Sequence, residues 1–115
     1  FSFYRIPKAL FTEPNFRELS TDAKVLYGIL LDRMSLSLKN QWLDAQNKVY
    51  IIFTVEEIMD ALNCANQKAT RLMVELEKQA GLIERKRQGL GRPNLIYVKN
   101  FAATINGKSC EKGDS

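Results

Sequence analysis

The sequence predicts an α+β fold in which three helices precede a two-stranded antiparallel hairpin. Apolar side chains recur at three- and four-residue steps in residues 20–34, 54–62 and 66–79, which is the spacing of one helix face. Two strand-like runs, Leu82–Gln88 and Asn94–Lys99, flank a turn that holds two glycines and a proline. A chain of 115 residues has room for one hydrophobic core.

The first eighteen residues form an aromatic arm. We expect a short strand over Phe3–Ile6 and one helical turn over Lys8–Phe11, after Pro7. The arm either folds over the core of its own domain or supplies a dimer contact, because large exposed apolar patches usually mark interfaces. It holds five of the eleven aromatic residues, namely Phe1, Phe3, Tyr4, Phe11 and Phe16.

The first long helix is predicted to begin after Ser20, whose hydroxyl can cap it, with Asp22 in the favourable first turn. After Asn40 the pattern changes and predicts a short extra hairpin, with strands over Trp42–Asp44 and Val49–Phe53. The apolar stripe of the helix consists of Ala23, Leu26, Tyr27, Leu30, Leu31 and Met34.

The second helix opens with a capping box formed by Thr54 and Glu57. Asn63 follows at the position where a helix often ends in a left-handed residue. Cys64, in the short turn that comes next, is expected to pack as a small hydrophobe. The expected buried side consists of Val55, Ile58, Met59 and Leu62.

The third helix is predicted over Asn66–Gln79 and ends at Ala80-Gly81. Its inward side holds Ala69, Leu72, Met73 and Leu76. Helix, strand, helix, short turn, helix and hairpin, in this order, predict a winged helix-turn-helix. We expect residues 1–101 to form this domain with its arm, and residues 102–115 to form a polar linker or tail.

Composition excludes several classes of function. Histidine is absent, which removes imidazole ligands and His-based triads. Two cysteines, Cys64 and Cys110, are too few for a structural zinc site and are expected as thiols of a reducing cytoplasm. No apolar run approaches the ~20 residues that cross a bilayer. We therefore expect no enzyme, no cofactor and no membrane partner.

Positive charge is concentrated in one third of the chain. Residues 64–99 hold eight basic and three acidic residues, a net charge of +5, whereas the other residues sum to −1 within a total of +4. A basic patch confined in this way is typical of a protein with a polyanionic partner, although a solvated surface has the same composition.

The third helix and the hairpin supply the candidate DNA-binding residues. Amide, hydroxyl and guanidinium groups read base edges, and a recognition helix brings its N-terminal residues to the bases. The outward side of the third helix carries Asn66, Gln67, Lys68, Thr70 and Arg71 and, a turn later, Glu75 and Lys78. A polar solvent face has the same pattern.

The predicted wing carries four cations, Arg85, Lys86, Arg87 and Arg92, which suit contact with phosphates. Its glycines permit a sharp tip. Side chains alternate faces along a strand, so either Lys86 or the pair of Arg85 and Arg87 faces the DNA.

A set of segments spread from Phe3 to Phe101 resembles the N-terminal domain of RepA_N-type replication initiators. The segments are Phe3-Tyr4-Arg5-Ile6-Pro7-Lys8, the helix Ser20–Met34 with Leu30-Leu31-Asp32-Arg33, Tyr50-Ile51-Ile52-Phe53-Thr54, Leu62-Asn63-Cys64, Gly81-Leu82-Ile83 and Gly91-Arg92-Pro93-Asn94.

The resemblance implies a winged-helix domain that binds double-stranded DNA at repeated origin sequences of plasmids, often as a homodimer. It implies DNA contacts from the helix that begins Asn66-Gln67-Lys68 and from the wing around Gly91-Arg92-Pro93. It also implies a separate C-terminal domain, through which host replication proteins are contacted. One departure is Ala65, which stands at the N-cap position where serine is expected.

Two alternatives share this fold. A transcriptional repressor uses the same scaffold, and only the resemblance favours an initiator. A winged helix used for protein assembly would instead use the aromatic arm as its contact.

Overall fold

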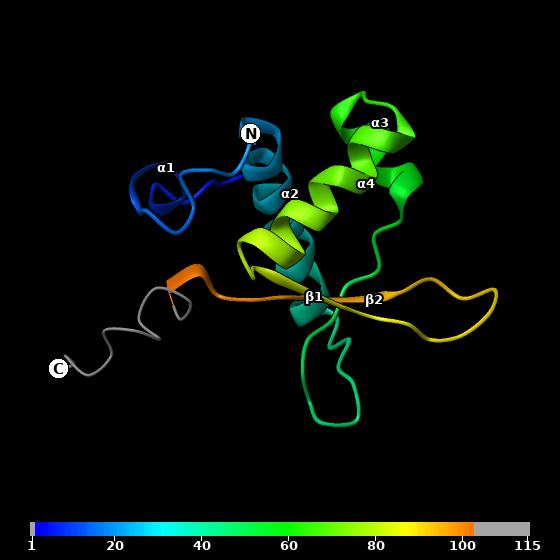
Figure 1. Cartoon of the computed structure of the whole chain (residues 1–115). Coiled ribbons are helices and arrows are strands. Elements are labelled where there is room, and N and C mark those ends of the chain that lie inside the picture. Colours follow the sequence, from blue (N-terminus) through cyan, green and yellow to red (C-terminus); the bar gives the residue numbers. More distant parts are fainter. Residues whose placement is uncertain (1, 103–115) are drawn as a thin grey trace, which may run out of the picture.

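The structure, a computed structural model, describes residues 2–102. Its elements are α1 (Ala9–Thr12), α2 (Thr21–Lys39), α3 (Val55–Leu62), α4 (Asn66–Val74), the π-helix η1 (Glu75–Gln79), β1 (Ile83–Lys86) and β2 (Leu95–Val98) (Figure 1). The order of three long helices and a hairpin is the predicted one, and the predicted single turn after Pro7 is α1.

Local capping signals fix where the helices begin and end. The hydroxyl of Ser20 accepts a hydrogen bond from the Ala23 N–H, as predicted for the start of α2. Both bonds of the predicted capping box are present at α3, since Glu57 N–H donates to Thr54 Oγ1 and Thr54 N–H donates to Glu57 Oε1. Asn63 adopts the predicted left-handed conformation, with φ of 53°.

The predicted hairpin over residues 42–53 forms only in part, with backbone hydrogen bonds from Asp44 to Lys48 and from Tyr50 to Trp42. A single bridge joins Leu43 to Val49, and Ile51 pairs with Ile96 of β2. Both backbone hydrogen bonds of Ile51 are made with Ile96, at 2.9 Å each, so this segment extends the edge of the wing sheet. Pairing with a distant strand therefore replaces the predicted local ladder only from Ile51 onward.

The loop between Trp42 and Tyr50 is organised by Asp44. Its carboxylate accepts hydrogen bonds from the N–H groups of Gln46 and Lys48 and from the Tyr97 hydroxyl of β2. These bonds, the one from Lys48 first, hold the pKa of Asp44 below its ordinary value. The loop is thus attached to the outer face of the wing.

The arm crosses α2 closely, and the predicted strand over Phe3–Ile6 does not form. A Cβ atom on Gly28 would lie 2.9 Å from Ile6 Cγ1 and 3.1 Å from the Arg5 carbonyl oxygen, so the crossing needs a glycine. Leu10 and Phe16 are fully buried, whereas Phe3 and Tyr4 are 75% and 59% exposed. The arm therefore covers its own core with Ile6 and its second half, and leaves Phe3 and Tyr4 largely exposed.

One core joins the helices to the hairpin. The predicted inward residues of α2, α4 and η1 belong to it, although Leu31 and Met34 are only partly buried. In α3 only Ile58 of the predicted side is fully buried, and Cys64 packs against the core as expected. The largest fully buried side chains are Tyr27, Phe16, Leu10, Leu26, Leu30, Ile51, Ile58, Leu72, Leu76, Leu82, Ile83 and Ile96.

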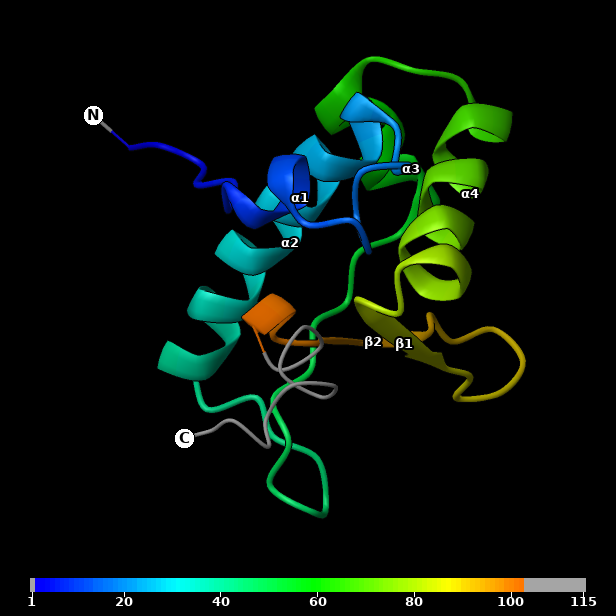
Figure 2. The ribbon, with the colours of Figure 1, turned by 60° about the vertical axis from the view of Figure 1, so that its left-hand side comes forward.

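The hairpin lies across one end of the helical layer, and its loop projects away from the body of the domain (Figures 1 and 2). None of the helices within residues 2–102 combines the length and apolarity that a bilayer crossing needs. The predicted polar tail lies, apart from Ala102, outside the described residues.

Candidate nucleic-acid interface

Helix α4 presents an uncovered polar side. It starts at Asn66 as predicted, although the methyl group of Ala65 cannot cap it. Of the candidate base-reading residues, Asn66, Gln67, Thr70 and Arg71 are all exposed. These four side chains share the N-terminal half of the helix and are available to a partner.

Lys68 differs from its neighbours on α4. Its ammonium group forms an ion pair with the carboxylate of Asp22 in the first turn of α2, and both side chains are less than half exposed. Lys68 therefore connects α4 to α2, and its charge is partly neutralised within the fold.

Arg71 and Glu75 form a pair one turn apart. The Arg71 Nε lies 3.9 Å from Glu75 Oε2, and the arginine side chain remains 63% exposed. Glu75 was expected on the outward side, but it is buried, because the wider π-turn brings Glu75 and Leu76 inward together. Its carboxylate accepts hydrogen bonds from the N–H and the hydroxyl of Ser20, at 2.9 and 3.0 Å.

The register of the wing decides where its cations point. Arg85 pairs with Ile96, which is buried, so both face the helices. The Nε and Nη2 atoms of Arg85 donate to Glu77 Oε1 of η1, at 2.9 and 2.6 Å. Lys86 lies on the opposite face of β1, with Glu84.

The remaining candidate cations are exposed. Lys78, Lys86, Arg87 and Arg92 form no ion pair with any residue between 2 and 102. The sequence leaves open which face of the wing strand meets the DNA. In the structure Arg85 is paired within the fold, whereas the cations nearer the tip of the wing are exposed.

A groove of about 270 Å³ lies between the start of α3, the last turn of α4 and the wing. Met73 of α4 and Ile96 of β2 contribute to its apolar floor, and Arg85, Arg92 and Pro93 contribute to its wall. In Figure 2 α4 and the hairpin loop lie on the same side of the molecule, away from the N-terminal end of the arm. Helix α4 and the basic loop therefore lie on the same side of the domain.

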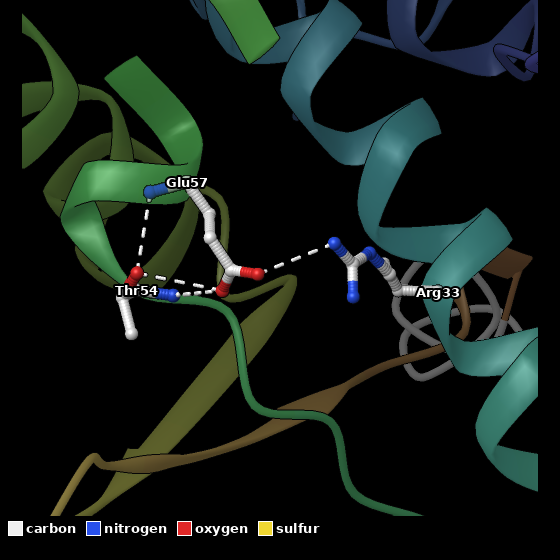
Figure 3. Close-up of polar contacts among 3 residues, drawn as sticks. All are labelled: Arg33, Thr54 and Glu57. Carbon is white, nitrogen blue, oxygen red and sulfur yellow. Dashed lines mark hydrogen bonds and ion pairs between the residues drawn. The ribbon is translucent and has the colours of Figure 1, made fainter. Parts of the chain in front are cut away.

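Three positioning residues could not be recognised from the sequence. Glu75 and Glu77 carry no motif, and their partners become visible only in the fold. Arg33 of α2 donates from Nη2 to Glu57 Oε2 at 3.4 Å (Figure 3). Its guanidinium lies 4.7 Å from the centroid of the Phe53 ring. Arg33 thereby joins α2 to the capping box of α3, the helix that precedes α4.

Comparisons with known proteins agree with this geometry. Residues 2–112 match a family described as the N-terminus of replication initiator protein A (RepA_N). A 41 kDa protein of Lactobacillus helveticus is 32% identical over 103 residues, which is 90% of this chain. The chain spans only 28% of the length of that relative.

Solved structures are similar over nearly the whole chain. One described as the N-terminal domain of a DNA binding protein is 38% identical with a TM-score of 0.76, covering 99% of this chain and 88% of that one. A Rep-DNA complex is 37% identical with a TM-score of 0.74, covering 99% and 89%. A structure of an MDR initiator is 40% identical with a TM-score of 0.71, covering 94% and 89%. The predicted winged-helix fold is confirmed.

Proposed function

This chain belongs to the RepA_N family of replication initiator N-terminal domains, and from that premise we propose that it binds double-stranded DNA at a plasmid replication origin. The observation that carries the proposal is that α4, with its exposed polar residues, and the basic loop of the wing lie on the same side of the domain. A similar chain, 37% identical, has been solved as a Rep-DNA complex, which supports the same role here.

In this proposal α4 enters the major groove with its N-terminal half at the bases. Asn66 and Gln67 offer amides to adenine, Thr70 contacts a methyl group or an acceptor, and Arg71 donates to guanine. Glu75 holds Arg71 from behind, so the guanidinium is oriented before it meets a base.

The exposed cations position the domain on the duplex. Lys86, Arg87 and Arg92 of the wing, with Lys78 at the end of the helical segment, contact phosphates and release counterions. Arg85 and Lys68 act indirectly, because each is already bound to a carboxylate of the same chain.

Two substitutions separate base reading from backbone contact. Arg71→Ala is expected to weaken binding to the preferred sequence by about tenfold to a hundredfold and to blur the preference, since a bidentate base contact is worth ~1–3 kcal/mol. Arg92→Ala is expected to weaken all duplexes alike and to lower the salt slope by about 1. Both are measured by titration of labelled duplexes at several salt concentrations.

Lys39→Ala, at the exposed end of α2, is the matched control and is expected to bind as the wild type does. Unchanged affinity and preference in Arg71→Ala would show that the α4 assignment is wrong. Footprinting on the DNA that flanks the gene then separates the candidate roles: tandem repeats support initiation, and a lone promoter palindrome supports repression. An assembly module would show no salt-dependent DNA affinity.

The exposed half of the arm supports a homodimer. Phe3 and Tyr4 lie along α2 and expose apolar surface that a second copy would cover. Sedimentation at increasing concentration tests this, and a strictly monomeric protein on and off DNA would exclude it. We place this binding role in the cytoplasm and expect it to involve no catalysis. We assign contacts with host replication proteins to the part of the initiator beyond this chain.

A further inference from the structure

Leu90 is the most exposed large apolar side chain within residues 2–102, with 99% of its surface accessible. It stands at the tip of the wing between Gly89 and Gly91, whose φ angles are 122° and 77°. Neither glycine has another group within 4 Å of its Cβ position. Leu90 thus plays no part in the core, and the backbone on both sides of it is free to approach a partner closely.

The loop that carries Leu90 is a closed turn. The Gln88 side-chain amide donates to the Pro93 carbonyl oxygen at 2.7 Å, and Arg92 N–H donates to the Gly89 carbonyl oxygen at 3.3 Å. These bonds join the two sides of the loop just behind its tip. The turn therefore keeps the side chain of Leu90 exposed, where a partner can contact it.

The charges around Leu90 limit what that partner is. Lys86, Arg87 and Arg92 are exposed near the tip, so the matching surface is apolar and bordered by negative charge. The minor groove of a duplex has this form, because sugar walls line it and phosphates border it. Proteins that bind there often insert a leucine or a similar wedge between base steps.

We propose that Leu90 is an apolar wedge that enters the minor groove beside the major groove occupied by α4. The inference rests on the proposed function, and it adds an apolar contact with DNA to the contacts made by the polar and charged residues. The hairpin loop projects from the same side of the molecule as α4, so its tip extends toward the neighbouring groove (Figure 2). There Leu90 separates two stacked base pairs in part, while the flanking cations hold the phosphates.

The test replaces Leu90 by alanine in a duplex-binding titration. Leu90→Ala is expected to bind the origin duplex about tenfold more weakly, because most of the apolar contact is lost. Its salt slope should equal that of the wild type, since no charge is removed, whereas Arg92→Ala changes the slope. Leu90→Met, which keeps a flexible apolar side chain, should retain most of the affinity.

Two controls keep the result interpretable. Leu38→Ala removes a leucine that is 60% exposed on α2 and should leave binding unchanged. Thermal unfolding of Leu90→Ala should match that of the wild type, because the side chain has almost no contact with the fold.

A fluorescent adenine analogue at the base step under the wing should brighten with the wild-type protein and much less with Leu90→Ala.

Two outcomes separate the wedge from the function on which it rests. Equal affinity and equal unstacking for Leu90→Ala and the wild type would overturn the wedge and leave DNA binding intact. Failure of the wild-type protein to bind any duplex in a salt-dependent way would overturn the proposed function itself.

Discussion

A single buried carboxylate, that of Glu75, connects the N-terminus of α2 to α4. It accepts two hydrogen bonds from Ser20, whose own hydroxyl caps α2, and it lies behind Arg71. The side chain is only 11% exposed, so the carboxylate depends on these donors in place of water. One residue thereby stabilises the fold and orients a candidate base-reading group.

Glu75→Ala is expected to lower the free energy of unfolding by about 2 kcal/mol, because two hydrogen bonds to a charged acceptor are lost and the half-buried donors of Ser20 lose their partner. Urea unfolding measures the change. Glu84→Ala, on the exposed face of β1, is the control and should stay within about 0.5 kcal/mol of the wild type. Equal stability for both variants would mean that water replaces the carboxylate at Ser20.

At the scale of elements, the wing is attached to the helices through Glu77 of η1 and Arg85 of β1. Both side chains are roughly one quarter exposed, and two donor atoms of Arg85 reach the same oxygen. The pair spans the corner at which the chain turns from the helical segment into the hairpin. We therefore expect this pair to help fix the angle between α4 and the basic loop.

Glu77→Gln distinguishes positioning from charge. Removal of a negative charge from a DNA-binding protein should by simple electrostatics tighten binding. We expect the reverse, a loss of about threefold to tenfold, because the wing is no longer held at its angle and Arg85 is left without its carboxylate. Duplex titration against salt measures it.

Glu84→Gln makes the same charge change on the outer face of β1, where no such pair is broken, and should bind as well as or slightly better than the wild type. If Glu77→Gln tightened binding as much as Glu84→Gln, the pair would have no positioning role.

The elements that the sequence predicts correctly are the ones whose signals are local. The Ser20 cap, the box of Thr54 and Glu57, and the left-handed Asn63 each depend on residues a few positions apart. The hairpin over residues 42–53 is shorter than predicted because Ile51 pairs with Ile96, and no local pattern contains this pairing between distant segments. The π-helix η1 is not predicted for a similar reason. The buried carboxylate of Glu75 is hydrogen-bonded to Ser20, which is distant in the sequence.

At the scale of the whole molecule, the sequence predicts that the polar side of α4 and the basic loop share a surface. It could not predict which cations are already paired. Lys68 and Arg85 look equivalent to Arg92 in the sequence, yet each is bound to a carboxylate that only the fold brings near. The number of cations free to meet DNA is therefore smaller than the local net charge suggests.

Tyr27 joins the first long helix to the end of the last strand. Its hydroxyl donates to the Lys99 carbonyl oxygen at 2.7 Å, between residues 72 positions apart. Burial raises the pKa of Tyr27 from 10.0 to about 12, and the backbone of Phe101 acts more weakly in the opposite direction. The folded state thus favours the neutral phenol, and it retains a proton that the unfolded chain loses first.

The contribution of Tyr27 to the free energy of unfolding is therefore expected to be fully present below about pH 10 and to fall as the pH rises from 10 toward 12. Tyr27→Phe lacks the hydrogen bond and should be less stable than the wild type at pH 8, but the difference should shrink above pH 10, since phenylalanine does not ionise. Urea unfolding of both proteins at matched pH values isolates this contribution, because the other tyrosines and lysines titrate equally in both. If the free energies of unfolding of the two proteins stayed parallel from pH 8 to 12, Tyr27 would ionise in the folded state as readily as in the unfolded chain. The contact between α2 and the end of β2 would then open without unfolding of the rest of the domain.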